Sequence, residues 1–246
     1  MCRHIGYLGR SRALATFLDA PHGLREQGRA PREMVVAKDN PDGWGVAWWE
    51  HRDAAPRHYR TTTKMWEDDA FADAHHCATA ALAAVRKASP DTTLQSVNNA
   101  PFVADTRAGH LAFSLNGYAF HDGGARRLHD ALAPETRLDG DTDTEVLFAL
   151  LCARVDAGAA PSAALAAVHH VVDPSAGAYV NLMVVGADEI AATTWHHTLY
   201  VQRTDDATTI ASEALDADPA WQRVPDASLL VADRTGVTIT DLEGLR

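Results

Sequence analysis

The sequence contains few cysteines and no long hydrophobic segment, and both absences narrow the class of protein. Its three cysteines, Cys2, Cys77 and Cys152, are odd in number and far apart. They fit neither a disulfide framework nor the CxxC pairs of a zinc site, which favours a reducing, cytoplasmic location. The longest apolar run, residues 78–85, is too short to cross a bilayer. The N-terminus lacks a basic segment followed by an apolar one, so we expect neither a secretory signal nor a membrane partner.

Positive charge is also scarce. The chain carries 22 Lys and Arg against 33 Asp and Glu, a formal net charge of −11. Such a chain would repel phosphate backbones, so nucleic acid is not an expected partner. Its 13 histidines include no His-Glu-x-x-His segment, and the three histidine doublets cannot chelate one metal because adjacent side chains diverge. There is no Gly-rich phosphate loop either, so the sequence predicts no metal and no cofactor.

The apolar pattern predicts an α+β fold. With 46% hydrophobic residues in 246, the chain can bury a sizeable core, and we expect one domain over residues 2–246. Helical spacing occurs at residues 11–18, 144–155 and 161–172, and polar loops are expected at 25–32 and 39–43. Strands are expected at residues 2–8, 44–49, 80–85, 111–115, 179–185, 189–195, 198–202, 208–211, 228–232 and 237–240. Strand clusters with helices between them favour stacked antiparallel sheets with the helices outside.

Cys2 is the first candidate for chemistry. A cysteine is small enough for the initiator Met1 to be removed in front of it. Cys2 would then carry a thiol and a free α-amine, so one residue could supply both the nucleophile and its base. The alternative is an inert, buried cysteine that happens to be second.

Asn116 and Gly117 could supply an oxyanion hole. They follow the apolar strand at residues 111–115. The side-chain N–H of Asn116 and the backbone N–H of Gly117 could converge on a developing oxyanion. The same dipeptide is typical of a tight hairpin turn, and both interpretations stay open.

Two charged residues could bind a substrate. Thr142 and Glu145 have capping-box spacing, which makes Asp143 the first helical residue, where the helix dipole favours an ionised carboxylate. Asp143 could hold an ammonium group, or it could serve the helix end alone. Arg86 ends an apolar run and could bind a carboxylate through two hydrogen bonds, or it could be a solvated charge at a strand end.

These segments, in this order, resemble the class II glutamine amidotransferases, which are N-terminal-nucleophile hydrolases. The matching stretches are Met-Cys-Arg-His at 1–4, Asn-Pro-Asp-Gly-Trp-Gly-Val-Ala-Trp at 40–48, Val-Arg-Lys-Ala-Ser-Pro at 85–90, Asn-Gly at 116–117 and Asp-Thr-Asp-Thr-Glu at 141–145. Residues 22–24, 27, 30–32, 191–195, 211–213 and 218–226 resemble the ergothioneine-pathway branch. Members of that branch remove the γ-glutamyl group from γ-glutamyl-hercynylcysteine sulfoxide.

The resemblance implies a four-layer αββα sandwich and a small-molecule γ-glutamyl substrate. Cys2 would attack the γ-carbonyl while its amine relays the proton, and Asn116 and Gly117 would stabilise the oxyanion. Arg86 would bind the glutamyl α-carboxylate and Asp143 the α-ammonium. Ser89 and Trp44 are also expected at the substrate. Three positions depart from the family pattern: Leu115 stands where His is common, Ser89 where Thr is usual and Trp44 where Phe is usual.

Other interpretations stay open at this point. The chain could be a glutaminase subunit that supplies ammonia to a separate partner, or a non-catalytic binding module with the same fold. A homo-oligomer is compatible with the sequence. His4, Trp44, Trp48 and Trp195 are candidates for contact with an imidazole-bearing, trimethylammonium-bearing leaving group, although core packing explains each tryptophan equally well.

Overall fold

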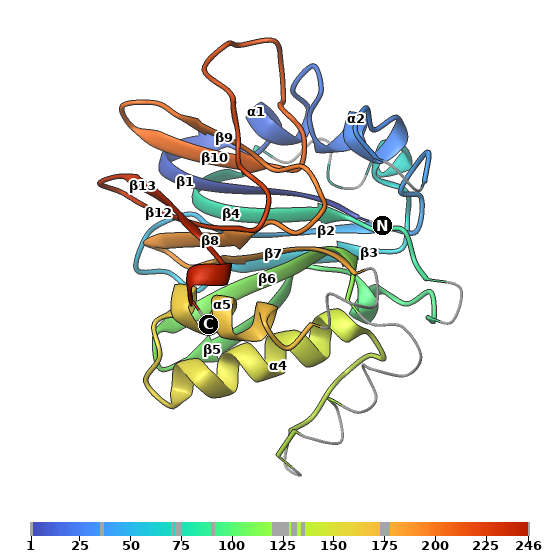
Figure 1. Ribbon diagram of the computed structural model, residues 1–246. Helices are drawn as coiled ribbons and strands as arrows, with labels where there is room; N and C mark the ends of the chain where they lie inside the picture. The colour runs from blue at the N-terminus through green and yellow to red at the C-terminus, as the bar shows by residue number, and fades with distance from the viewer. Residues whose placement is uncertain are drawn as a thin grey trace.

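Two antiparallel sheets pack face to face and carry helices on their outer faces (Figure 1). The computed structural model describes residues 2–34, 37–69, 71, 75–89, 92–119, 128, 132–133, 136–172 and 178–245. Helices α1 (Ala15–Leu18) and α2 (Leu24–Arg29) cover one sheet, and α4 (Asp143–Asp156) and α5 (Pro161–His169) cover the other. The expected α+β class and four-layer αββα sandwich are therefore confirmed.

Within the described residues the first sheet has seven strands, and they follow one another in the order β11 (Gln222–Arg223), β9 (Tyr200–Arg203), β10 (Ala207–Ala211), β1 (Arg3–Ala13), β4 (Cys77–Val85), β2 (Trp44–Trp49) and β3 (Arg57–Thr61). The second sheet has six, in the order β13 (Val237–Asp241), β12 (Ser228–Asp233), β8 (Glu189–Thr193), β7 (Tyr179–Val185), β6 (Gly109–Tyr118) and β5 (Phe102–Thr106). Short 3-10 turns lie at Met65–Glu67, Ser96–Asn98 and Glu243–Leu245.

The local predictions were wrong at several places. Residues 25–32 were expected to be a loop, but α2 occupies most of them. The helix was missed because only three of its residues are buried, Leu24, Gln27 and Gly28, and just one of them has a large apolar side chain. The helix expected at residues 11–18 begins only at Ala15, since β1 continues past a bulge to pair with the start of β4. Strands β3 and β5 were missed because these edge strands lack a regular apolar alternation.

Alternation along β1 decides which side chains face the second sheet. Ile5 and Tyr7 point outward into the core under α1 and α2. His4 points inward, where its Nδ1 lies 2.9 Å from the Ser114 hydroxyl of β6. Gly6 also faces inward, and a Cβ there would lie 2.7 Å from the Met183 sulfur, so the sheets approach too closely for a side chain. The same period of two puts Cys2 on the inner face.

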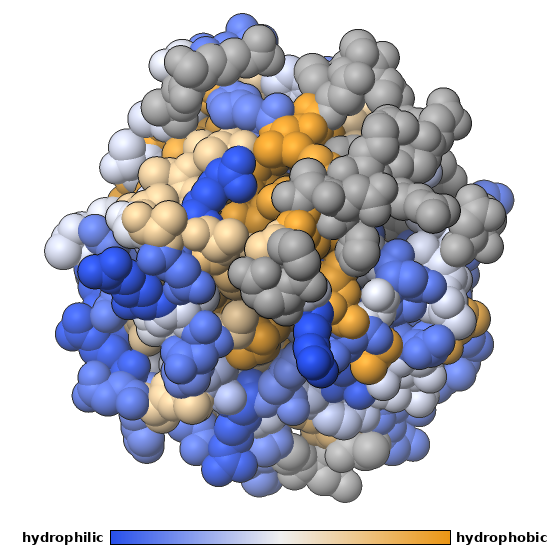
Figure 2. Space-filling model, turned by 90° about the horizontal axis from the view of Figure 1, so that it is seen from below, coloured by the Kyte–Doolittle hydropathy of each residue, from blue (hydrophilic) through white to orange (hydrophobic). Residues whose placement is uncertain are grey.

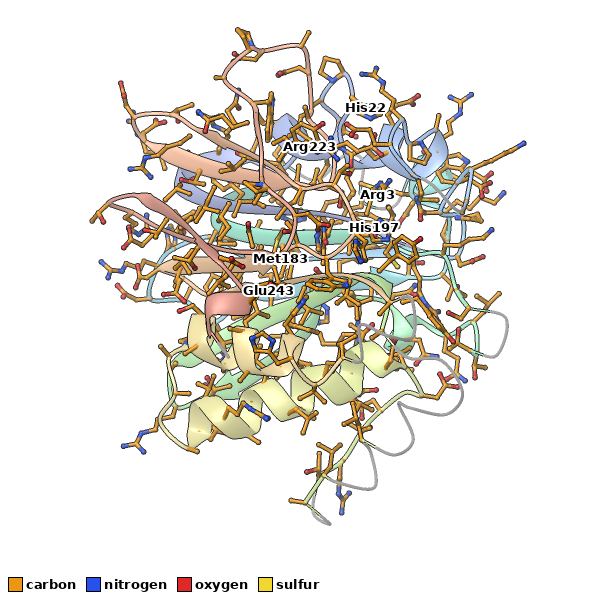
Figure 3. All side chains as sticks on the ribbon, in the orientation of Figure 1. Arg3, His22, Met183, His197, Arg223 and Glu243 are labelled. Carbon is orange, nitrogen blue, oxygen red and sulfur yellow. The ribbon has the colours of Figure 1, made fainter. Side chains whose placement is uncertain are left out.

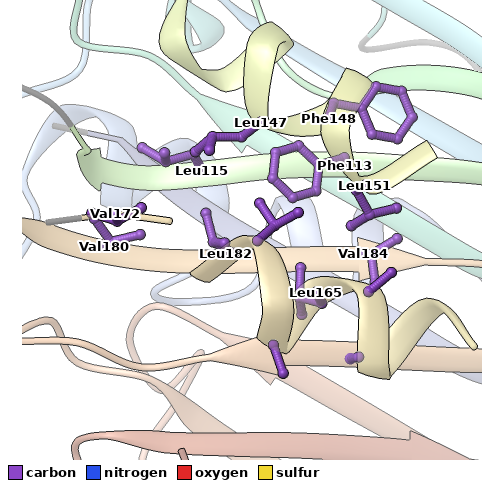
Figure 4. Close-up of a cluster of buried hydrophobic side chains, with 14 of the residues drawn as sticks. Phe113, Leu115, Leu147, Phe148, Leu151, Leu165, Val172, Val180, Leu182 and Val184 are labelled. Carbon is purple, nitrogen blue, oxygen red and sulfur yellow. The ribbon is translucent and has the colours of Figure 1, made fainter. Parts of the chain in front are cut away.

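The second sheet rests on α4 and α5 through an apolar cluster (Figure 4). Phe113 of β6 and Phe148 of α4 stack with ring centroids 5.5 Å apart. Leu147 and Leu165 bury the helix faces against the strands. Figure 2 views the molecule from this side and shows polar side chains around the rim with apolar ones gathered near the middle. No helix in the described part of the chain is long and apolar enough to cross a membrane.

Candidate active site

A pocket of about 520 Å³, which includes open solvent at its mouth, lies at one end of the sandwich. The beginning of β1, the ends of β4 and β6 and the start of α4 meet there. Five of the residues expected at the substrate line it: Cys2, Arg86, Ser89, Gly117 and Asp143. The fold thus brings together a thiol, a cation and a carboxylate that are far apart in the sequence.

Cys2 reaches this pocket because strand pairing aligns it with the end of β4. Arg3 pairs with Val85, so the residues just outside this pair, Cys2 and Arg86, are neighbours at the sheet end. The Cys2 thiol is free and partly exposed, and the Cys2 carbonyl accepts a 3.3 Å hydrogen bond from Arg3. Met1, whose removal the free-amine chemistry needs, lies outside the described residues. The interpretation of Cys2 as a deeply buried cysteine is wrong.

Asn116 and Gly117 are part of β6, so the hairpin-turn interpretation is wrong. They pair with Asn181 and Val180 of β7. Gly117 has a φ of +140°, and a Cβ on it would lie 1.7 Å from the Tyr179 carbonyl oxygen, so only glycine fits. Gly117 lines the pocket, whereas the fully buried Asn116 lies behind it on the inner face.

The Asn116 amide is held between the sheets. Its Nδ2 donates a 3.2 Å hydrogen bond to the Ser212 hydroxyl. An amide nitrogen carries two N–H groups, so this bond leaves one donor. Its Oδ1 has no hydrogen-bond partner among the described residues.

Arg86 is a buried cation rather than a solvated strand-end charge, because only 7% of it is exposed. Its guanidinium donates to the Thr92 hydroxyl at 2.9 Å and to the Asn99 side-chain oxygen at 3.3 Å. Within the described residues no carboxylate forms an ion pair with it. The pocket therefore offers a positioned guanidinium whose partners are all neutral, which suits a substrate carboxylate.

Asp143 is the first residue of α4, as the capping-box spacing predicts. The Thr142 hydroxyl accepts a 3.3 Å bond from the Glu145 N–H. Burial raises the pKa of the Asp143 carboxyl above its usual value, an effect that the sequence does not show. The Ala119 and Thr144 N–H groups and the Arg86 charge oppose this rise without cancelling it. A bound ammonium group would lower this pKa, because a nearby cation favours the charged form of a carboxyl.

The raised pKa of Asp143 predicts how kcat/KM depends on pH. Because only the ionised carboxylate binds ammonium, kcat/KM for a γ-glutamyl amide is expected to rise with pH through a pKa above the ordinary aspartate value of about 3.9. For a glutaryl amide, which lacks the ammonium, kcat/KM should not show this acid limb, the rise with pH that comes from Asp143. Steady-state assays on both substrates between pH 4 and 8 would measure the difference, and identical acid limbs would count against Asp143 as the ammonium ligand.

A polar link that sequence reasoning missed connects the two walls of the pocket. Asn98 donates to the Asp141 carboxylate at 2.7 Å, and the Asp141 N–H donates back to the Asn98 side-chain oxygen at 3.1 Å. Thr93 also donates to this carboxylate, at 2.6 Å. The segment that holds Arg86 is thereby tied to the segment just before α4. The Asn98-Asn99 doublet was the only signal available in the sequence.

Trp44 lies outside the candidate site, contrary to expectation. Alternation along β2 points it away from the inner face, and its indole is fully buried, where it donates to Asp68 at 2.9 Å. Trp48 faces the same outer core. Ser89 lines the pocket, whereas Pro90 of the same motif lies outside the described residues.

Directly behind Cys2, on the outer face of the first sheet, lies a buried ionic network. The fully buried Glu213 carboxylate accepts from Arg3 at 2.9 Å and from His22 at 2.6 Å. The backbone N–H groups of Arg32 and Glu33 donate to it at 2.8 and 3.1 Å. Burial alone would raise the pKa of Glu213, but the hydrogen bond from His22, the charge of Arg3 and the two backbone donors lower it to about 2. The network anchors Arg3, the residue next to Cys2.

Glu213→Gln is expected to destabilise the fold by about 3 kcal/mol at pH 7, because it leaves the Arg3 charge buried and unpaired. The folded pKa of about 2 lies below the unfolded value of about 4.3. The stability from this carboxylate is therefore fully present above the unfolded value and is lost as pH falls toward 2. Urea unfolding should show a smaller difference in the free energy of unfolding between wild type and variant at pH 3 than at pH 7. Glu67→Gln, at an exposed glutamate, is the control, and a pH-independent gap would contradict this account.

The described residues contain no group of three or more His, Cys, Asp or Glu side chains arranged to hold a metal ion. The candidate site presents the groups described above. They comprise a thiol, a positioned guanidinium, a carboxylate at a helix start and an Asn-Gly pair whose glycine has a positive φ. Such a set can bind an amino acid head group beside a nucleophile.

The chain has full-length relatives, although no protein-family model matches it. It is 33% identical over 251 residues to a gamma-glutamyl-hercynylcysteine sulfoxide hydrolase of Mycobacterium tuberculosis (strain CDC 1551 / Oshkosh), covering 99% of this chain and 97% of that one. It is 32% identical over 246 residues to the hydrolase of the same name from Mycolicibacterium smegmatis (strain ATCC 700084 / mc(2)155), covering 98% of this chain and all of that one.

Solved structures resemble the fold at lower identity. A glutamine phosphoribosylpyrophosphate amidotransferase from B. subtilis superposes with a TM-score of 0.74 at 16% identity, over 98% of this chain and 49% of that one. This chain thus spans about half that enzyme's length. A glutamine aminotransferase class-II domain protein from Silicibacter pomeroyi gives a TM-score of 0.63 at 20% identity, covering 98% and 99% of the two chains. Both confirm the stacked sandwich.

Proposed function

The chain belongs to the family of gamma-glutamyl-hercynylcysteine sulfoxide hydrolases, and from that premise we propose that it cleaves the γ-glutamyl amide of such a substrate with Cys2 as nucleophile. The products are glutamate and hercynylcysteine sulfoxide, a step of ergothioneine biosynthesis. One observation carries the proposal: Cys2, Arg86 and Asp143 line a single pocket. The guanidinium and the carboxylate match the two charges of a glutamyl head, and the thiol supplies the nucleophile.

The proposed reaction proceeds through a thioester. The α-amine of Cys2 takes the thiol proton as the sulfur attacks the γ-carbonyl carbon. The Gly117 N–H and the remaining Asn116 side-chain N–H stabilise the oxyanion that forms. The intermediate collapses, the C–N bond breaks, and the amine of Cys2 returns the proton to the leaving nitrogen. Water then attacks the thioester, and glutamate leaves with the thiol restored.

Substrate binding in this proposal divides between the two walls of the pocket. Arg86 binds the α-carboxylate and Asp143 binds the α-ammonium, and Ser89 supplies a hydroxyl beside them. We further propose that residues 2–246 act as a single domain in the cytoplasm, where a reducing environment keeps the Cys2 thiol free.

A panel of γ-glutamyl amides tests the proposal: glutamine, glutathione and the hercynylcysteine sulfoxide conjugate. The purified chain is expected to release glutamate from the conjugate with the highest kcat/KM, without added metal or cofactor. Intact mass should show that Met1 is absent. Glutamine turnover that rises with a partner protein would instead indicate an ammonia-supplying subunit, and binding without turnover would indicate a non-catalytic module. Either result would contradict the proposed hydrolase.

A further inference from the structure

A second hollow, of about 980 Å³ including open solvent, opens on the β7 side of the same end of the sandwich. Charged and aromatic side chains dominate its lining: Glu33, Tyr179, His196, His197, Arg223 and Asp226. The hydrolysis mechanism uses none of these side chains. Figure 3 labels two of them, His197 and Arg223, together with Arg3.

This hollow adjoins the Cys2 pocket. Tyr118, which lines the Cys2 pocket, pairs directly with Tyr179 across β6 and β7. Residues opposite one another in antiparallel strands have Cβ atoms about 5 Å apart, so these two tyrosines form a shared wall. On the other side, His197 lies close enough to Arg3 for that charge to act on it. His197 and Arg3 are labelled at the end of the sandwich where the N-terminus lies (Figures 1 and 3).

The hollow has the chemistry to hold an organic cation. Tyr179 is 36% exposed, and its ring centroid lies 5.9 Å from that of His196 and 5.3 Å from that of His197. Burial, with a smaller contribution from the Arg3 charge, lowers the pKa of His197 to about 4, so its ring is neutral at pH 7. Tyrosine faces attract cations, and a carboxylate near them strengthens the attraction.

Two carboxylates reach the same hollow. Glu33 accepts a 3.1 Å hydrogen bond from Tyr200, and its own N–H is fixed by Glu213. The Asp226 carboxylate lies 3.2 Å from the His196 ring nitrogen and accepts from the His196 N–H at 2.8 Å. These contacts hold both acids in place at the wall.

Two groups in the hollow point to a ligand with oxygen atoms. The His197 Nε2 is buried and has no hydrogen-bond partner among the described residues, although buried polar atoms are normally bonded. Arg223 is exposed and forms no ion pair with any described acid. A ligand that carried both a cation and an oxyanion would satisfy the acids, the imidazole and the guanidinium together.

We propose that the hollow formed by Glu33, Tyr179, His196, His197, Arg223 and Asp226 is the subsite for the leaving group, and that it selects a zwitterion with a quaternary ammonium. The ammonium lies against Tyr179 beside the two carboxylates, and the leaving group's carboxylate binds Arg223. His197 bonds a polar atom between them. This inference rests on the proposed function, which places the scissile amide at Cys2 in the adjoining pocket. It replaces Trp44 and Trp48 as leaving-group contacts, because both pack in the core under α1 and α2, and it replaces His4, which is fully buried between the sheets with its Nδ1 at the Ser114 hydroxyl.

Substrate preference tests the subsite. For Tyr179→Ala and Arg223→Gln, the ratio of kcat/KM on the hercynylcysteine sulfoxide conjugate to kcat/KM on glutamine is expected to fall about 10-fold. Tyr179→Phe keeps the ring face and should keep the ratio within about 3-fold. Arg107→Gln, an exposed arginine in the β5–β6 turn, is the matched control and should leave both values unchanged. An unchanged ratio in Tyr179→Ala and Arg223→Gln would overturn the subsite.

A binding measurement separates this inference from the proposed reaction. Calorimetric titration of the Cys2→Ala protein with hercynine, the trimethylated histidine, should show binding that Tyr179→Ala weakens about 10-fold. If the wild type cleaves no γ-glutamyl amide, the proposed function fails, while this titration still tests the hollow. Hercynine affinity that is equal with and without Tyr179 would overturn the subsite even in an active hydrolase.

Discussion

Replacing Cys2 by alanine is expected to lower kcat on the hercynylcysteine sulfoxide conjugate at least about 10⁴-fold, because no other described residue that lines the pocket carries a thiol to form the thioester. Cys2 is partly exposed and precedes β1, so its sulfur contributes little to the core. The free energy of unfolding should therefore change by less than about 1 kcal/mol. Stopped assays of glutamate release and urea unfolding would measure the two quantities.

Two controls separate the nucleophile from the other cysteines and from the fold. Cys2→Ser keeps a hydroxyl and a free amine, and it should retain more activity than Cys2→Ala but far less than wild type. Cys77→Ala removes an exposed thiol at the start of β4 and should leave the rate unchanged. A Cys2→Ala protein with a tenth of wild-type activity would remove Cys2 from the reaction.

Replacing Arg86 by methionine is expected to lower kcat/KM on γ-glutamyl amides about 10²–10³-fold, chiefly through KM. Removing one partner of a buried charge contact costs about 2–5 kcal/mol. The contact with the α-carboxylate exists before and during the reaction, so its loss weakens substrate and transition state together. Arg86→Lys keeps the charge but loses the planar fork, and it should recover only part of the affinity.

A substrate without the α-carboxylate distinguishes binding from a purely structural role. Arg86 also holds Thr92 and Asn99, so its loss could disturb the pocket wall. On γ-aminobutyryl amide, which lacks that carboxylate, wild type and Arg86→Met should differ by less than about 5-fold. Equal losses on both substrates would show that Arg86 only supports the wall and does not bind the carboxylate.

The parts of the site that sequence analysis predicted are those governed by local rules. The capping-box spacing around Asp143 identified the start of α4 correctly, because the Thr142–Glu145 contact spans one helical turn. The apolar run before Arg86 ends where β4 ends. Neither signal showed that these two segments share a pocket. They are brought together by strand pairing and by the link between Asn98 and Asp141, which are 43 residues apart.

Long-range contacts explain what the sequence did not show. Arg3 and Glu213 are 210 residues apart, so a buried ion pair between them leaves no local pattern. The rise in the pKa of the Asp143 carboxyl was not predicted, because a helix-start position is visible in the sequence whereas burial is not. Trp44 was assigned to the substrate from its place in a motif, but strand alternation turns it to the outer core. The leaving-group hollow gathers Glu33, Tyr179 and Arg223 from three separate segments, and its lining became visible only in the fold.

Covalent labelling at the N-terminus tests the central claim most directly, which is that the Cys2 sulfur and the chain's own amino group perform the reaction in a glutamate-binding pocket. A diazoketone analogue of glutamine would be incubated with the purified protein, and the product mapped by intact mass and top-down fragmentation. The account predicts one label, on Cys2, in a chain that lacks Met1, with slower labelling in Arg86→Met. A label on another residue, or an active chain that still carries Met1, would contradict it.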